Sequence, residues 1–158
     1  MPNPDMFGRD VLEALEFELN FLDQGGYGRS VRKPWLSKEI FVESPTCLNF
    51  GDRNRTFPCD RCALFDFVPE DKRSENIPCH HIPLTSSGET VETLSDTAND
   101  AKAQDALRAW LQATIAELKR RRQQELDAAQ PETRSEAKPA EAAQELLAPV
   151  LKSGDSQR

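Results

Sequence analysis

The sequence lacks the features that would direct it into or across a membrane. No apolar run approaches the roughly 20 residues that span a bilayer. The first ten residues, MPNPDMFGRD, do not contain a basic segment followed by an apolar one. We therefore expect a cytoplasmic protein without membrane contact. Because disulfides are rare in that compartment, its four cysteines are better suited to metal binding or redox chemistry.

The sequence is also short of apolar residues. Hydrophobic residues make up 37% and charged residues 30% of its 158 positions, which is lean for a packed domain of that length. We predict one domain over residues 1–130 and a disordered tail over residues 131–158, where Ala, Glu, Pro, Gln and Ser predominate. The net charge of −7 disfavours general attraction to nucleic acid or to anionic membranes.

Residues 47–81 contain every cysteine and histidine of the chain. A structural zinc ion takes four ligands, usually Cys with some His, and a C-x2-C pair supplies two of them from one tight turn. The remaining two ligands then come from elsewhere in the segment. The predicted zinc ligands are Cys47, Cys59, Cys62 and Cys79, with His80 and His81 as alternates for Cys79 or Cys47.

The expected stoichiometry is one zinc ion per chain. Zinc is favoured over iron because the spacing does not match the common ferredoxin patterns. A four-thiolate site carries a net charge of −2, so nearby cations are expected to balance it from outside the ligand shell. The candidates for this role are Arg53, Arg55 and Arg61.

Catalytic interpretations find less support in the sequence. A thioredoxin-type site needs its C-x2-C at the start of a helix, whereas Cys62 precedes a strand-like run. A nucleophile pair of Cys47 with His80 or His81 has no orienting third residue. A three-ligand zinc with an open position remains the alternative catalytic design, and its candidate bases are Glu39, Glu43 and Asp66.

Two amphipathic helices flank the cysteine segment. Apolar residues recur at spacings of three and four in both, which predicts helices over residues 5–23 and 96–129. The two stripes are Leu12, Leu15, Leu19 and Leu22 in the first helix, and Leu107, Leu111, Ile115 and Leu118 in the second. We expect the helices to pack on each other with Trp110 partly buried. The alternative is a dimer through the long helix.

Short alternating runs between the helices predict strands. They cover residues 39–43, 63–68, 81–84 and 89–93, with a turn at residues 86–88 between the last two. The predicted fold class is therefore α+β: a small zinc-stapled antiparallel sheet with the helices on one face and the zinc at its far end. The glycine-rich loop at residues 25–35 is interpreted as a connector that Trp35 pins to the core, rather than as an anion-binding loop.

The tail holds one apolar cluster. Residues 140–151 predict a short helix that either docks on a protein partner or forms transiently without one. The residues proposed to contact that partner are Leu146, Leu147, Val150 and Leu151.

These features together predict a non-catalytic interaction or regulatory module built around zinc. A thiol-based redox or metal sensor is the second hypothesis, since oxidation of Cys59 and Cys62 would release the metal. Nucleic-acid binding ranks third because of the net charge. It would use the cations Arg29, Arg32, Lys33, Arg53, Arg55 and Arg120 to Arg122.

Overall fold

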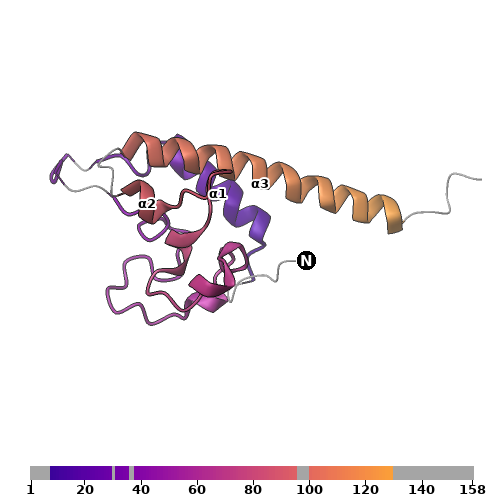
Figure 1. Cartoon of the computed structure of the whole chain (residues 1–158), viewed down its shortest axis with the longest axis horizontal. Coiled ribbons are helices and arrows are strands. Elements are labelled where there is room, and N and C mark those ends of the chain that lie inside the picture. Colours follow the sequence, from indigo (N-terminus) through magenta and orange to yellow (C-terminus); the bar gives the residue numbers. More distant parts are fainter. Residues whose placement is uncertain (1–7, 30, 36–37, 96–99, 130–158) are drawn as a thin grey trace, which may run out of the picture.

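The computed structural model describes residues 8–29, 31–35, 38–95 and 100–129. These residues form three α-helices: α1 at Val11–Asp23, α2 at Val91–Ser95 and α3 at Asp100–Ala129. Four 3-10 helices lie between α1 and α2 in the sequence: η1 at Cys59–Arg61, η2 at Phe65–Phe67, η3 at Glu70–Lys72 and η4 at Pro78–His81. α3 runs along one side of the molecule, and the segment with the 3-10 helices loops away from it (Figure 1).

The apolar stripes of α1 and α3 face each other, as the sequence predicts. Asp10 caps α1 by accepting a hydrogen bond from the backbone N–H of Leu12 at 3.3 Å. Gly25, with a φ of 76°, closes the other end. Leu15 and Leu111 are fully buried in one continuous core between the helices. Burial of these stripes is the main source of stability in this part of the chain.

The two halves of α3 differ. Its buried residues end at Leu118, and the second half continues beyond the rest of the described chain (Figure 1). Leu126 in that half is 58% exposed. An ion pair between Arg122 and Asp10 ties the beginning of this extension to the start of α1. The predicted tail and its helix at residues 140–151 lie outside the described residues.

The predicted antiparallel sheet is wrong: the described part of the chain contains no β-strand, and its regular elements are all helical. Residues 39–43 form a turn instead, in which the N–H of Glu43 donates to the carbonyl of Glu39 at 3.0 Å. Phe41, at the centre, has a φ of 65°, which an extended strand does not allow. The hydroxyl of Tyr27 holds this conformation by accepting from the N–H of Phe41 at 2.9 Å.

The alternating run at residues 63–68 folds as η2 and its flanking turns. Its N–H groups bond three residues back, from Phe67 to Leu64 at 3.1 Å and from Val68 to Phe65 at 3.1 Å. Leu64 and Val68, four positions apart, are both buried. A helical turn can therefore bury this pair without a neighbouring strand, which a strand of that length would require.

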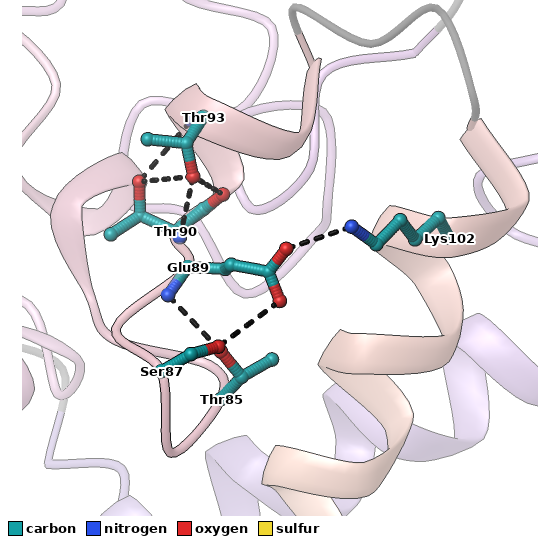
Figure 2. A network of polar contacts seen from close by, with 6 residues as sticks. All are labelled: Thr85, Ser87, Glu89, Thr90, Thr93 and Lys102. Atoms are coloured by element: carbon teal, nitrogen blue, oxygen red, sulfur yellow. Dashed lines mark hydrogen bonds and ion pairs between the residues drawn. The ribbon is translucent and has the colours of Figure 1, made fainter.

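Of the hairpin predicted over residues 81–93, the structure contains the turn but neither of the two strands. Thr85 and Glu89 close the turn, with the Thr85 hydroxyl accepting from the N–H of Glu89 at 3.1 Å. Figure 2 shows Lys102 of α3 pairing with the Glu89 carboxylate at 2.7 Å. The second expected strand is replaced by α2, because Thr90 and Thr93 cap each other's backbone N–H groups at 3.3 and 2.9 Å.

Aromatic residues anchor the loops to the helices, although not at the predicted place. Trp35 is 74% exposed, so the expectation that it pins the glycine-rich loop to the core is wrong. Tyr27 does this instead: it is buried and packs edge-on against Phe21 at 5.1 Å between ring centroids. Trp110 is partly buried, as expected, with edge contacts to Phe41 and Phe67.

Candidate metal centre

All four cysteines line one small, partly open cavity. Its volume is about 30 Å³, and its lining also includes the polar residues Asn49 and Arg55. A cavity needs at least about 10–15 Å³ to hold one water molecule, so this one has room for a single small occupant. The apolar residues around it are Phe41, Leu48, Leu64, Phe65, Val68 and Pro78.

The C-x2-C pair is shaped by a tight turn. Cys59 opens η1 directly after Pro58, and Cys62 caps its end, with the N–H of Cys62 donating to the carbonyl of Cys59 at 3.0 Å. At η4 the proline stands one position further on: Pro78 is the first residue of the helix and Cys79 the second. Proline favours this first position because its fixed φ suits it and it has no N–H to leave unpaired.

A buried carboxylate of α1 positions Cys47 through Ser44. Glu18 is only 1% exposed. Its Oε2 accepts hydrogen bonds from the hydroxyls of Ser44 at 2.5 Å and Thr46 at 2.7 Å, and its Oε1 accepts one from Tyr27. Ser44 in turn accepts the N–H of Cys47 on its carbonyl at 3.0 Å.

The position of Glu18 carries a signal that the sequence reading missed. It stands three residues after Leu15 and four before Leu22, so helical geometry places it on the buried stripe. A carboxylate on that stripe must find donors, because an unpaired buried charge is very costly. The hydroxyls of Tyr27, Ser44 and Thr46 meet that requirement.

Two sets of hydrogen bonds from side chains to the backbone shape the loop between Cys47 and Cys59. The amide of Asn49 exchanges two hydrogen bonds with the backbone of Phe57, both at 2.9 Å. The carboxylate of Asp52 accepts from the N–H groups of Asn54 and Thr56, each at 2.9 Å. These contacts support Arg55 in a left-handed conformation with a φ of 49°.

The thiols influence one another electrostatically. Burial, with a smaller contribution from the neighbouring Cys47 and Cys59, raises the pKa of Cys62 to about 11. The pKa values of Cys79 and Cys47 are also raised, first by burial and then by neighbouring cysteines. Such thiols stay protonated at neutral pH unless a metal displaces their protons, which couples metal binding to proton release.

Two guanidinium groups oppose this effect. Arg55 donates a hydrogen bond to Cys59 Sγ at 3.4 Å and lowers the pKa values of Cys47 and Cys79. Arg9, which the sequence did not point to, lowers the pKa of Cys62. It is fixed by a hydrogen bond from its Nη2 to the carbonyl of Thr46 at 3.1 Å.

The other two predicted counter-charges lie away from the sulfurs. Arg61 is exposed on η1, and Arg53 is exposed on the loop before it. Of the three arginines named from the sequence, only Arg55 lines the cysteine cavity.

Both histidines make contacts outside the cavity. The Nε2 of His80 lies 2.9 Å from the carbonyl oxygen of Ile40, and burial lowers the pKa of this imidazole. The Nδ1 of His81 lies 3.0 Å from Glu92 Oε2 on α2. Cys79 therefore lines the cavity, whereas the two histidines that follow it in the sequence do not.

The sulfurs are gathered but not at coordination distance. Among the described residues, no three Cys, His, Asp or Glu side chains are close enough to hold a metal ion as they stand. Zinc–sulfur bonds of about 2.3 Å require sulfurs about 3.8 Å apart. Metal binding would therefore require the four sulfurs to move closer together.

The residues named for catalytic or nucleic-acid roles are placed elsewhere. Glu39, Glu43 and Asp66 do not line the cysteine cavity. The cations of α3 are used in ion pairs: Lys119 with Glu16, Arg120 and Arg121 with Glu117, and Arg122 with Asp10. Arg29 is likewise paired with Asp100 at 2.8 Å.

Comparisons with protein-family models, with curated proteins and with solved structures found no match to this chain. In the part of the chain that the structure describes, none of the helices has an apolar stretch that could cross a bilayer. The functional argument therefore rests on the geometry of the cysteine cavity.

Proposed function

We propose that Cys47, Cys59, Cys62 and Cys79 bind one zinc ion and that the metal staples a non-catalytic interaction or regulatory module of the cytoplasm. The observation that carries this proposal is the convergence of all four cysteines, from three separate turns, on one cavity of about 30 Å³. Four thiolates around a single small ion is the ligand set of a closed structural zinc site.

The choice of Cys79 over the histidines follows from their contacts. His80 is engaged with the carbonyl of Ile40 and His81 with Glu92. Recruiting either one would break that contact and bring a ring into a space sized for one ion. The small cavity also favours a single zinc ion over an iron–sulfur cluster, which needs room for several atoms.

The energetic role of the metal is to hold the cysteine segment. That segment has 3-10 turns as its only regular elements among the described residues. Structural zinc contributes on the order of 10 kcal/mol of folding free energy. This is comparable with the net stability of a whole domain, about 5 to 15 kcal/mol, so the metal would decide whether the segment folds.

Metal analysis of protein purified without a histidine tag tests the proposal. We expect about one zinc per chain, and we expect the Cys47→Ser and Cys79→Ser variants to lose it while His80→Ala and His81→Ala keep it. Zinc below about half an equivalent in the unaltered protein contradicts the proposal, because structural sites bind tightly. Iron in place of zinc would overturn the identity of the metal.

A redox or metal sensor is the second candidate, and the position of Cys59 favours it. Cys59 lines both the cysteine cavity and a groove on the surface, so a small oxidant reaches it from outside. Hydrogen peroxide would oxidise the thiolates of Cys59 and Cys62 to a disulfide, being reduced to water, and the zinc would leave.

Mild peroxide with a zinc-indicator dye separates the two candidates. Zinc released at peroxide levels that modify accessible thiols supports the sensor. Zinc retained at those levels supports a purely structural role. Reduction with a dithiol and added zinc should restore the starting state if the oxidation product is a disulfide.

A further inference from the structure

A broad groove lies on the surface outside the cysteine cavity. It has a volume of about 850 Å³ and runs between the loop of residues 53–60 and the segment of residues 73–78. Cys59 forms part of its wall and part of the wall of the cavity. The groove is lined by Arg53, Asn54, Arg55, Phe57, Pro58, Cys59, Asp60, Phe65, Arg73, Glu75, Asn76 and Pro78.

The apolar and polar residues of this groove suit an extended peptide. Phe57, Phe65, Pro58 and Pro78 form the apolar part of its lining. Proteins commonly use aromatic residues and arginine at interfaces, because rigid rings give contact area at little entropic cost. The side-chain amide of Asn76, like that of Asn54, carries both a donor and an acceptor for a peptide backbone.

Two arginines of the groove have guanidinium nitrogens without a hydrogen-bond partner among the described residues, in contrast to the paired arginines of α3. Arg53 makes no hydrogen bond or ion pair with the described residues. Arg73 is fixed over the ring of Phe65 at 5.2 Å and by a hydrogen bond from its Nε to the carbonyl of Val68 at 3.2 Å. This anchoring orients the guanidinium while leaving its terminal nitrogens for a ligand.

The acidic residues of the groove do not cancel these charges. Glu75 is paired with Lys72 at 3.7 Å and Arg55 is engaged by Cys59 Sγ at 3.4 Å, so Arg53 and Arg73 face Asp60 as the remaining charges of the lining. The groove is thus locally cationic in a chain whose net charge is −7. An arginine cluster with orienting contacts is suited to carboxylates, which it binds through two parallel hydrogen bonds.

We propose that this groove binds an extended acidic segment of a partner protein, with carboxylates at Arg53 and Arg73 and apolar side chains against Phe57 and Phe65. The proposal rests on the interaction-module function and names where the partner docks. Cys59 lines both the groove and the cysteine cavity, so zinc bound to Cys59 would fix the position of this part of the groove wall. Loss of the metal is therefore expected to abolish docking.

Fluorescence anisotropy with labelled, end-capped octapeptides tests this directly. The probes alternate Leu with Glu, with Gln or with Lys, and are titrated with the full-length zinc-loaded protein at low salt. We expect the Glu–Leu peptide to bind at least tenfold more tightly than the other two. Arg53→Glu is expected to weaken it at least tenfold, whereas Arg120→Glu, at an exposed cation of α3, should weaken it less than threefold.

Several results would overturn the proposal. No binding of the Glu–Leu peptide by zinc-loaded protein at millimolar concentration would do so, as would equal effects of Arg53→Glu and Arg120→Glu. A synthetic peptide of residues 131–158 that displaces the probe would make the chain's own tail the occupant. A single-stranded oligonucleotide that displaces it more strongly would make the groove a nucleic-acid site.

Zinc content, measured on the same samples, distinguishes failure of the groove from failure of the metal site. Full zinc occupancy without peptide binding rejects the groove alone. Absence of zinc from the unaltered protein rejects the metal proposal, whatever the peptide does. Peptide binding that persists after chelation rejects the link between the two.

Discussion

The helical and cysteine halves of this protein are held together by different means. The first consists of α1 and the start of α3, where Leu15 and Leu111 are fully buried in a continuous apolar core. The second half is residues 44–82, where the regular elements that the structure describes are all 3-10 helices. It also contains the hydrogen bonds of Asn49 and Asp52 to the backbone and the cysteine cavity. The cysteine half also contributes Ala63, Leu64, Val68 and Ile82 to that core, but its loop between Cys47 and Cys59 is shaped by side-chain hydrogen bonds.

Glu18 provides a polar contact between the two halves, beside the apolar core that they share. This residue belongs to the helical half by its place on α1 and to the cysteine half by its bonds to Ser44 and Thr46. A buried carboxylate with three hydroxyl donors is a directional contact, unlike the leucine stripe around it. It fixes where the turn before Cys47 lies on α1, so α1 positions one wall of the cysteine cavity.

The largest expected effect is in the leucine core. Leu111→Ala removes a fully buried side chain and should lower the free energy of unfolding by about 4 kcal/mol, through lost burial and a residual cavity. Leu126→Ala on the exposed half of the same helix is the matched control and should change it by less than about 0.5 kcal/mol. Urea denaturation of both variants provides the measurement. Similar values for the two would mean that α3 does not pack on α1.

A smaller effect is expected at the junction. Glu18→Ala deprives the hydroxyls of Tyr27, Ser44 and Thr46 of their acceptor and should cost about 2 kcal/mol. It should also weaken zinc binding in a chelator competition, because the turn before Cys47 loses its anchor. Glu16→Ala, which removes only an exposed ion pair to Lys119, should cost under about 1 kcal/mol and leave zinc affinity unchanged. An effect of Glu18→Ala no larger than that of Glu16→Ala would rule out the anchoring role.

The smallest expected effect is at the start of the projecting half of α3. Arg122 holds the pKa of Asp10 below its usual value, so the pair stabilises the fold above the unfolded pKa of about 4. That contribution is lost as the pH falls through the lowered pKa. Asp10→Asn keeps the helix cap and removes the pair, so it should cost no more than about 0.5 kcal/mol at pH 7 and progressively less as the pH falls below about 4. A cost that does not decline with falling pH would trace it to the cap.

The sequence was a good guide to the helices and to the cysteine cluster. The leucine spacing of three and four is a long-range pattern that tertiary contacts reinforce, and the contact between α1 and α3 follows from it. The convergence of Cys47 and Cys79 on the C-x2-C turn also agrees with the spacing argument. Whether they bind zinc stays a prediction.

The turns and the short helix that replace the predicted strands could not be foreseen, because the runs are too short for alternation to decide between strand and helical turn. Leu64 and Val68 lie on one face of a strand at even spacing and on one face of a helical turn at a spacing of four. Side-chain contacts settled the outcome: Tyr27 holds the turn at Phe41, and Thr90 with Thr93 starts a helix. Such long-range and capping contacts are invisible to a test of periodicity.

Hydrogen exchange in the presence and absence of metal tests most directly the claim that the two halves are stabilised differently. Peptides from residues 44–82 and from residues 107–118 are compared in zinc-loaded protein and after removal of the metal by a chelator. We predict that protection over residues 44–82 falls at least tenfold while protection over residues 107–118 changes less than threefold. Equal protection of both regions with and without the chelator, or equal loss in both, would contradict the account.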